Sequence, residues 1–488
     1  MIENLSIGFD VVFTTHNLFF IFLGCLLGTL VGIIPGIGPT ASISIILPIT
    51  FSLEPVTGIM MLAGIYYGSQ YGGSTTAILL NTPGENSSVM TCIDGNQMAK
   101  QGRPGIAIAA AAIGSFIAGI LMVIAVAFLS PLLSEVAFKF GPAEFALLML
   151  FGLVSVIVFT DQDLLKGIVI SLIGVSIGMI GADINSGINR FTFDIPELID
   201  KIGFVIVAVG LFAVPEIIKN LQNPDSITRF LSNFKIIPSK QDFQRIIPAS
   251  LRGTFIGGLL GLIPGGGITT ASYAAYAFDK KISVNKDQFG KGAIEGVAAP
   301  EAANNAAAQA GFIPLLSLGI PENAVMALIL SSLMMFGITP GPLMIESQPE
   351  LFWGLVVSML VGNFILLILN FPLIRIWVQV LRVPYHMLYP MILFACCLGI
   401  FATNTNMYEL YILAGVSIFG YILYIFDLSP ITFILGFVLG SMFEENFRRA
   451  LTISQGDFTI FYSSSVSIII LFLISLMIIF QIFKKRSL

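Results

Sequence analysis

The sequence predicts an all-α, polytopic integral membrane protein, and two observations carry this prediction. Hydrophobic residues make up 56% of the 488 positions and charged residues only 10%, with a mean hydropathy of +0.94, far outside the range of soluble globular chains. Apolar runs of about 15 to 25 residues recur along the chain, each near the length that crosses roughly 30 Å of hydrocarbon as a helix. Runs such as IAIAAAAIGSFIAGILMVIAVAFL do not alternate as the strands of a membrane β-barrel do. We expect about 12 transmembrane helices, together with broken or re-entrant hairpins.

The transmembrane part divides into two repeats. Four glycines, spaced four residues apart, recur at a constant distance of 229 positions: Gly24, Gly28, Gly32 and Gly36 as Gly253, Gly257, Gly261 and Gly265. Between residues 28–40 and 257–269, eight of thirteen positions are identical, which indicates an internal repeat. We expect repeat 1 at 12–218, a cytoplasmic connecting loop at 219–246, repeat 2 at 247–445, and a C-terminal transmembrane helix with a cytoplasmic tail at 446–488.

Lys and Arg in the connecting segments predict the orientation, since short loops rich in them stay cytoplasmic. Residues 219–252 hold six basic residues against two acids, and the tail ends in KKRSL. Residues 183–201 are rich in acids, and residues 346–350 contain no basic residue. We therefore expect the N-terminus outside and the C-terminus in the cytoplasm, with the two repeats inverted relative to each other. Arg448 and Arg449 fit this orientation badly, because it places them outside.

Each copy of the glycine motif is expected to form a broken or re-entrant hairpin. The segment FSLEPVTG after the first copy is acidic, whereas residues 279–291 after the second carry four lysines, so each copy returns to its starting side. After Gly267 only about eleven apolar residues remain before Asp279, which span roughly half a bilayer at 1.5 Å per residue. Inverted repeats are typical of secondary transporters, whose sites lie at the repeat interface near the membrane midplane.

The glycines of the motif have two interpretations. Glycines at every fourth position form a smooth face that lets helices approach closely, which explains the outer glycines as packing. Packing explains less at the two breaks, since proline removes an intrahelical hydrogen bond and glycines weaken the helix further. A helix restarting at Pro39 or Ile268 would aim free backbone N–H groups at an anion. The substrate-binding candidates at the breaks are Pro35, Gly36, Gly38, Thr40, Pro264, Gly265, Gly266, Gly267 and Thr269.

Two polar clusters also interrupt the apolar pattern, at 66–88 and 292–323. Polar and ionisable side chains at membrane depth are functional candidates by default. Their substrate-binding candidates are Ser74, Thr75, Asn304 and Asn305, and their coupling-ion candidates are Glu301, Asn304, Asn305 and Glu322. The alternatives are hydrogen bonds between helices for the two asparagines, a helix cap for Ser74 and Thr75, and ion pairs at the membrane face for the two glutamates.

Other classes of site find no support in the sequence. The cysteines, Cys25, Cys92, Cys396 and Cys397, have neither CxxC spacing nor a Cys/His ligand pattern, so we expect neither a disulfide framework nor a structural metal. No basic run is interleaved with aromatic residues, which makes nucleic acid an unsuitable partner. GIGPT and GGGIT lack the preceding strand and the GK[ST] of a phosphate-binding loop. No cofactor other than a coupling Na+ or H+ is expected.

Several long motifs resemble the large permease subunit of the tripartite tricarboxylate transporters, the TctA family. They include GIIPGIGPTASISIILPITF, GIYYGSQYGGSTTAILLNTPGE, DGNQMAKQG, GLIPGGGITTASYAAYAFDKK and FGKGAIEGVAAPEAANNAAAQAGFIPLLSLGIP, in the order of the family, between about Gly24 and Pro342. The resemblance implies a secondary transporter of the prokaryotic inner membrane, driven by a sodium or proton gradient. It also implies a small membrane subunit, a periplasmic solute-binding protein and a carboxylate substrate such as citrate. By resemblance, the substrate and ion positions are Pro35, Gly36, Gly38, Pro264, Gly265, Gly267, Glu301, Asn304 and Asn305.

The chain departs from the family pattern at one place. After GIP the family usually continues with glycine and a small hydroxyl residue, whereas this chain has Glu322 and Asn323. An added carboxylate near the site would repel a polyanion. The departure favours a less highly charged carboxylate as the substrate, or a Glu322 that can be protonated.

The sequence thus predicts a transporter rather than an enzyme, working by alternating access between the two hairpin tips. Na+ or H+ bound together with the anion would lower the cost of moving the anion through a medium of low dielectric. The alternatives are a channel and a membrane-embedded hydrolase with Ser74 or Ser42 as nucleophile. A hydrolase lacks an activating base, since His16 and His386 both lie outside the polar clusters.

Overall fold

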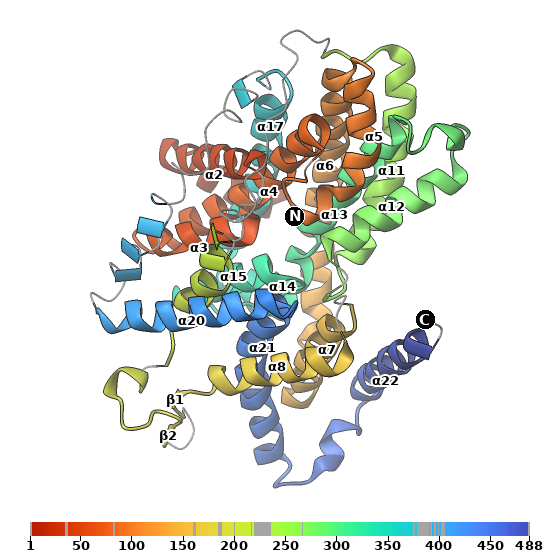
Figure 1. Ribbon diagram of the computed structural model, residues 1–488. Helices are drawn as coiled ribbons and strands as arrows, with labels where there is room; N and C mark the ends of the chain where they lie inside the picture. The colour runs from red at the N-terminus through yellow and green to blue at the C-terminus, as the bar shows by residue number, and fades with distance from the viewer. Residues whose placement is uncertain are drawn as a thin grey trace.

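The chain is almost entirely helical in a computed structural model, as the sequence predicts (Figure 1). The structure describes residues 2–34, 38–81, 83–159, 163–183, 188–199, 201–215, 217–218, 236–265, 267–373, 376–377, 390, 393–394, 397–398, 400–401 and 406–486. One small departure from the all-α prediction lies in the acid-rich segment. There β1 (Gly181–Ala182) pairs antiparallel with β2 (Asn189–Arg190).

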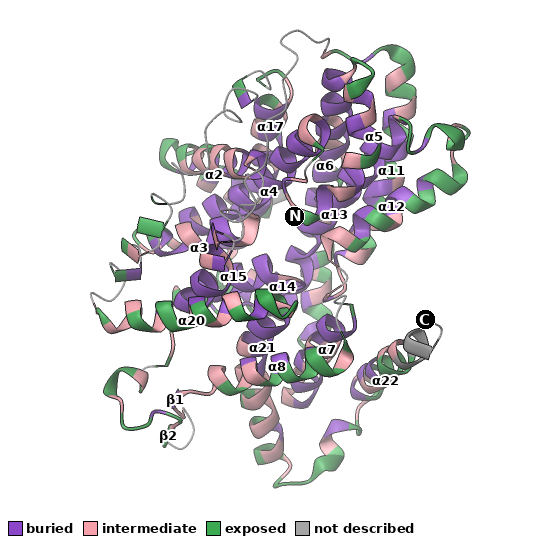
Figure 2. Cartoon of the chain, in the orientation of Figure 1, coloured by how far each residue is buried: buried purple, intermediate pink, exposed green. Residues whose placement is uncertain are grey.

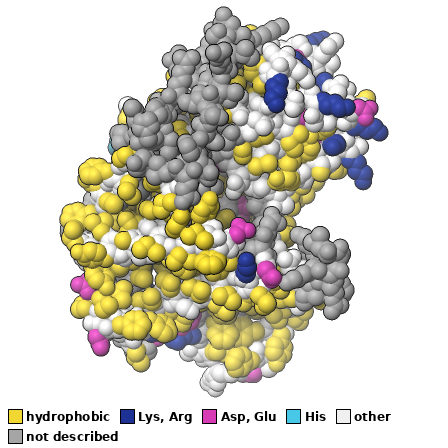
Figure 3. All heavy atoms as spheres, viewed as in Figure 1, with side chains coloured by type: hydrophobic (Ala, Val, Ile, Leu, Met, Phe, Trp, Pro, Cys, Tyr) yellow, Lys and Arg dark blue, Asp and Glu magenta, His cyan; other side chains and the backbone are white. Residues whose placement is uncertain are grey.

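Membrane crossings are divided between long helices and shorter ones. Among the described residues, the helices long and apolar enough to cross a membrane alone are α2 (Thr15–Ile33), α6 (Pro104–Ala137), α7 (Pro142–Phe159), α17 (Pro349–Asn370) and α20 (Tyr408–Ile425). Shorter apolar helices include α3 (Pro39–Thr50), α8 (Leu164–Gly178), α9 (Phe204–Ala208) continued by η3 (Val209–Ala213), and α15 (Ala324–Met335). Hydrophobic side chains cover much of the visible surface, while Lys and Arg gather at the upper right (Figure 3).

The first glycine motif forms a hairpin of α2 and α3, against which α4 (Pro55–Leu80) packs. The second helix of the hairpin begins at Pro39, the predicted restart. The end of this helix lies beside the start of α2, because both contact the first turn of α4. There Thr57 donates a hydrogen bond to Asn17 of α2 at 2.6 Å, and a Cβ on Gly58 would lie 3.3 Å from the carbonyl oxygen of Thr50 in α3. The hairpin therefore returns to the end of the molecule at which it began.

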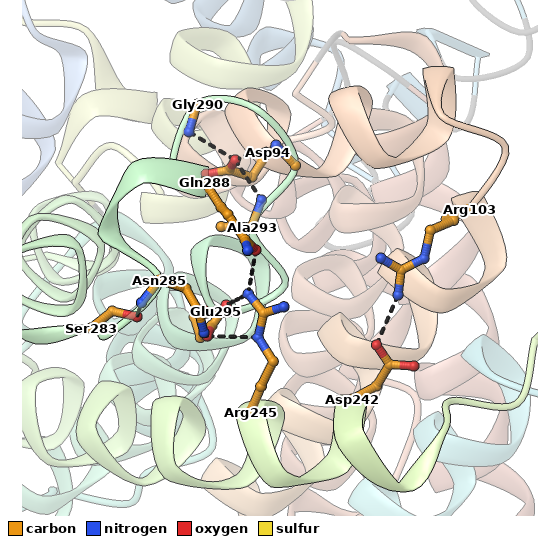
Figure 4. A network of polar contacts seen from close by, with 11 residues as sticks. Asp94, Arg103, Asp242, Arg245, Ser283, Asn285, Gln288, Gly290, Ala293 and Glu295 are labelled. Carbon is orange, nitrogen blue, oxygen red and sulfur yellow. Dashed lines mark hydrogen bonds and ion pairs between the residues drawn. The ribbon is translucent and has the colours of Figure 1, made fainter.

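The second motif forms a matching hairpin of α11 (Lys240–Leu260) and α12 (Ile268–Ile282), packed on α13 (Glu295–Ala310). Its second helix begins at Ile268, again the predicted restart. Ion pairs hold its base together: Arg252 contacts Asp279 at 2.5 Å, and Arg245 contacts Glu295 at 2.5 Å (Figure 4). This hairpin also returns to its starting end, near η4 (Lys286–Gln288).

The two repeats run in opposite directions between these hairpin bases. From the first base, α4, η1 (Asn86–Ser88) and α5 (Val89–Lys100) lead to the second. There Asp94 accepts hydrogen bonds of 2.8–2.9 Å from the backbone N–H groups of residues 290, 292 and 293 (Figure 4). From the second base, α13, α14 (Phe312–Leu318) and α15 lead back to the first, where the rings of Phe336 and Phe51 lie 5.4 Å apart. The fold therefore contains the inverted repeats that the sequence predicts.

The outer glycines of each motif are contact surfaces between helices. In each repeat they face backbone carbonyl groups of the partner helix, and a Cβ on any of them would overlap a carbonyl oxygen. The pairs are Gly24 with Met61, Gly28 with Ile65, Gly32 with Ser69, Gly253 with Ala299, Gly257 with Ala303, and Gly261 with Ala307. Close approach of backbones is thus the role of these stripes.

The remaining helices flank this central pair of repeats. Helix α1 (Ile2–Val12) packs on α17, α21 (Pro430–Ile453) packs on α7 and α8, and α22 (Ser465–Arg486) packs on α7. The short elements are α16 (Met344–Ser347), η2 (Pro196–Leu198) and η5 (Phe458–Phe461). Arg448 of α21 contacts Asp183 at 3.1 Å and Glu444 at 2.9 Å. Arg448 therefore lies at the same end as the acid-rich segment, and acidic partners explain how a basic residue is accommodated there.

Asp242 stabilises the start of α11, where the connecting region ends. Ser239 and Asp242 form a capping box, and Arg103 donates to Asp242 at 2.8 Å. Burial opposes ionisation, but hydrogen bonds from Ser239 and the charge of Arg103 outweigh it, so the pKa of Asp242 lies below its ordinary value of 3.8. Asp242→Asn should lower the free energy of unfolding at about pH 7 by about 0.5–1 kcal/mol.

Because the folded-state pKa is lowered, this stabilisation is present above the ordinary pKa and is lost as the pH falls through the folded-state value. Thermal unfolding of the detergent-purified chain is measured from about pH 7 to about pH 3. The unfolding midpoints of wild type and variant should differ at about pH 7 and converge in acid. A difference that stays constant over this range would contradict the assignment.

Candidate functional site

Each repeat is interrupted by a short break at corresponding places. The break in repeat 1 covers residues 81–85, between α4 and η1, and the break in repeat 2 covers residues 319–323, between α14 and α15. Each opens with a left-handed residue, Asn81 (φ 57°) or Gly319 (φ 70°), and each contains a proline two residues later. By this correspondence Glu85 matches Asn323, and the family departure Glu322 occupies the place of Gly84.

The hairpin tips contact these breaks. The N–H of Gly265 donates to the carbonyl oxygen of Glu322 at 2.9 Å, and Gly265 has the positive φ of 76° that favours glycine. In repeat 1, a Cβ on Gly84 would overlap the carbonyl oxygen of Gly32. Each break is thereby held against the hairpin of its own repeat.

The predicted residues of the two tips are placed as follows. Pro264 is buried, and Gly38 and Gly267 are the N-cap residues of α3 and α12. Thr40 and Thr269 are half-buried in the first turns of these helices. Pro35, Gly36 and Gly266 lie outside the described residues.

One polar network joins the break of repeat 1 to α13 of repeat 2. Asn304 donates its amide to Glu85 Oε1 at 3.1 Å, and Thr91 of α5 donates to Glu301 Oε1. Asn305 donates to the hydroxyl of Ser115 on α6 at 2.7 Å. Glu301, Asn304 and Asn305 are all 0% exposed. The EAANNA segment thus meets residues of repeat 1, at the interface where secondary transporters bind their substrates.

A second network surrounds the break of repeat 2. Glu322 accepts a hydrogen bond of 2.6 Å from the amide of Asn323, and the same amide donates to the hydroxyl of Tyr66 on α4 at 2.9 Å. One turn further along α4, Gln70 accepts from Ser87 at 3.2 Å, and Ser87 also donates to Glu85. One face of α4 therefore connects both breaks.

Many polar atoms at this junction of the repeats have no hydrogen-bond partner. Burial is nearly complete along α4, α13 and α15 (Figure 2). The unpartnered buried atoms on α4, η1, α13 and the described parts of the breaks are Tyr67 Oη, Gln70 Nε2, Thr75 Oγ1, Ser88 Oγ, Glu301 Oε2, Asn304 Oδ1, Asn305 Oδ1, Gln309 Oε1 and Glu322 Oε2. Buried polar atoms in proteins are nearly always hydrogen-bonded, so this concentration makes the junction the candidate functional site.

Not every predicted residue takes part. The hydroxyl of Ser74 is satisfied by the carbonyl oxygen of Tyr71 at 2.8 Å. His16 packs on Phe20 with ring centroids 4.9 Å apart, and His386 lies outside the described residues. Among the described residues, no group of three or more His, Cys, Asp or Glu side chains is arranged to hold a metal ion.

Sequence reasoning did not select Glu85, Thr91 or Ser88 as site residues, although Glu85 and Ser88 lie in the polar cluster 66–88. The signal that could have found Glu85 is the second part of the repeat. Corresponding residues there, such as Pro83 and Pro321, are 238 positions apart instead of 229. A search at one constant distance stops at the glycine stripes. Repeat 2 has nine more residues than repeat 1 between its glycine stripe and the helix that the stripe contacts, since Gly253 and Ala299 are 46 positions apart and Gly24 and Met61 are 37.

Two open cavities lie away from the junction. One, of about 530 Å³, is lined by residues 189–199 around β2, and the other, of about 860 Å³, is lined by the end of α21. Neither contains the unpartnered buried groups. The chemistry of the junction, and not the size of a surface hollow, therefore identifies the candidate site.

Comparison with known proteins decides the family. The tripartite tricarboxylate transporter TctA family matches residues 18–435. The chain belongs to this family. An uncharacterised 52.8 kDa protein in the TAR-I ttuC′ 3′ region of Agrobacterium vitis is 49% identical over 470 residues, which cover 96% of this chain and 93% of that protein. An uncharacterised protein in the TAR-II ttuC′ 3′ region of Agrobacterium vitis is 51% identical over 211 residues, covering 43% of this chain and 87% of that protein. No solved structure matches the chain.

Membership of the TctA family places this chain, a multi-pass membrane protein, in a family of tripartite tricarboxylate transporters. The tripartite architecture implies a small membrane subunit and a periplasmic binding protein. In this TctA protein, the junction of the two repeats combines carboxylates, amides and hydroxyls of both halves. Such a site can bind a small ion or anion in contact with both repeats at once.

Proposed function

We propose that this TctA protein imports a carboxylate through the prokaryotic inner membrane by alternating access, coupled to Na+ or H+, with the N-terminus outside and the C-terminus in the cytoplasm. The observation that supports the proposal is the concentration of unpartnered buried oxygen and nitrogen atoms where the two inverted repeats meet. The substrate would be delivered by a periplasmic solute-binding protein, and the chain would work with a small membrane subunit. Reporter fusions at each terminus test the orientation.

The chemistry of the site residues indicates which of them would bind the carboxylate and which the coupling ion. Backbone N–H groups at the starts of α3 and α12, together with the amide hydrogen of Asn304 that does not bond Glu85, would face the carboxylate. Asn305 donates both of its amide hydrogens within the protein, to Ser115 and to the carbonyl oxygen of Glu301, and so would position this face of α13. Thr40, Thr75 and Thr269 add hydroxyl groups. Glu301 and Glu322 would bind the coupling ion. A carboxylate that crosses together with a cation carries less net charge, which lowers its desolvation cost.

The geometry favours a carrier over the alternatives. Ser74 donates its hydroxyl hydrogen to the backbone carbonyl oxygen of Tyr71 instead of to a base, which disfavours a hydrolase with Ser74 as nucleophile. Glu301, Asn304 and Asn305 at the junction are 0% exposed, as expected for a substrate site that is reached from one side at a time. A channel would instead need a continuous wetted path.

Transport by proteoliposomes tests the proposal. Vesicles that hold the chain with its co-purifying subunits are given labelled mono-, di- and tricarboxylates, with no gradient, a sodium gradient or a proton gradient. We expect saturable uptake of at least one carboxylate that requires a gradient, and exchange of internal unlabelled for external labelled substrate. Flat uptake under every condition contradicts a transporter, and uptake without saturation or exchange indicates a channel.

A further inference from the structure

Two carboxylates from different repeats are linked through one amide at the junction. Glu85 comes from the break of repeat 1, and Glu301 lies on α13 of repeat 2, three residues before Asn304 and hence on the same helix face. The Asn304 amide nitrogen donates to Glu85 Oε1 at 3.1 Å. This hydrogen bond uses the nitrogen of Asn304 and leaves its oxygen as an acceptor.

Three oxygen atoms of this cluster, each with free lone pairs, have no hydrogen-bond partner. Thr91 donates to one oxygen of Glu301, and the other, Oε2, is buried without a partner. The same holds for Asn304 Oδ1 and Ser88 Oγ. A Cβ placed on Gly73 would lie 2.9 Å from both Ser88 Oγ and Glu85 Cγ, so these two side chains flank the same point of α4.

Positive charge is not supplied by the surrounding described residues. The ion pairs of the described chain involve neither Glu85 nor Glu301. Burying a carboxylate without a positive partner is costly, because the protein interior replaces only part of its hydration. A bound cation would offset this cost.

We propose that Glu301 Oε2, Asn304 Oδ1, Ser88 Oγ and the carboxylate of Glu85 bind one sodium ion. Hard cations prefer sets of oxygen ligands from carboxylates, amides and hydroxyls. A proton can be shared between at most two of these oxygens and leaves the others without a partner, whereas a metal cation contacts all of them at once. Because Glu85 and Ser88 belong to repeat 1 and Glu301 and Asn304 to repeat 2, the ion ties the two repeats together.

That this ion drives transport rests on the proposed function, whereas its binding does not. Binding is therefore measured without transport, as ²²Na+ bound at equilibrium by the detergent-purified full chain, with choline keeping the ionic strength constant. We expect saturable binding by the wild type. Glu301→Gln and Ser88→Ala should each weaken it by about tenfold or more, by analogy with loss of ligand-shell groups in other ion sites.

A matched control is Glu144→Gln, which makes the same chemical change at a carboxylate of α7 that bonds Ser464 and Ser467 instead. This variant should bind sodium as the wild type does. Absence of sodium binding by the wild type, or unchanged binding by folded Glu301→Gln and Ser88→Ala, overturns the sodium site. If carboxylate uptake then still follows a proton gradient, the proposed transport function stands without it. Conversely, sodium binding without uptake of any carboxylate would retain the site and refute that function.

Discussion

Glu322→Gly should shift the substrate preference of this TctA protein toward more highly charged carboxylates. Glu322 is 0% exposed, and its Oε2 has no hydrogen-bond partner. A carboxylate at about 8 Å from a substrate charge, in an effective dielectric of about 20, repels it by about 2 kcal/mol, or about thirtyfold in relative uptake for each additional substrate charge. The ratio of tricarboxylate to monocarboxylate kcat/KM in proteoliposomes measures this shift.

Glu322→Gln separates charge from volume in this experiment. A Cβ on Gly311 would lie 2.7 Å from Glu322 Cγ, so the side chain is closely packed and its removal also leaves space. Glutamine keeps the shape and removes the charge, and it should produce most of the same shift. Unchanged kinetics in both variants across the substrate panel would rule out Glu322 as a determinant of substrate charge. A shift in substrate preference with Glu322→Gly but not with Glu322→Gln would show that the space left by the side chain, and not its charge, causes the shift.

Gly257→Ala should strongly destabilise the folded protein. Gly257 faces the carbonyl group of Ala303, and an added Cβ would overlap the carbonyl oxygen. Since the obstacle is backbone within a buried helix, α11 and α13 would have to separate. We expect a loss of about 1–3 kcal/mol or more, seen as a lower midpoint of thermal unfolding and a lower yield of monodisperse protein.

The adjacent residue gives the matched control. A Cβ on Gly258 would meet only the Met122 side chain, at 3.0 Å from its sulfur, and that side chain is flexible. Gly258→Ala should therefore be tolerated or slightly stabilising, because alanine favours the helix by up to about 1 kcal/mol over glycine. Equal effects of the two substitutions would show that helix propensity, and not the close backbone contact, decides stability here.

Much of the fold could be predicted because it is encoded by local features. Proline and glycine interrupt helices wherever they occur, so the starts of α3 at Pro39 and α12 at Ile268 follow from the sequence. The glycine spacing likewise marks the faces on which α2 meets α4 and α11 meets α13. The inverted arrangement follows from the charges of short loops, which act over a few residues.

The site could be predicted only in part, because its contacts join distant segments. Asn304 was a candidate, but its partner Glu85 is 219 positions away. The hydrogen bond from Asn323 to Tyr66 spans 257 positions, and nothing local to either residue indicates it. The roles of Ser74 and Thr75 also depend on packing. They are neighbours on α4, yet Ser74 bonds its own helix and Thr75 is left unpartnered.

The glycine contacts constrain how the protein can move. Helices that touch through their backbones, as α2 does with α4 and α11 with α13, have no intervening side chains that could change rotamer and let them slide. We therefore expect each pair to move as a rigid body. In the alternating access proposed above, a change in which side of the membrane reaches the centre would then be absorbed by the segments between the pairs. Asn81 and Gly319, single left-handed residues at matching places in the two repeats, are positioned as the pivots of that movement.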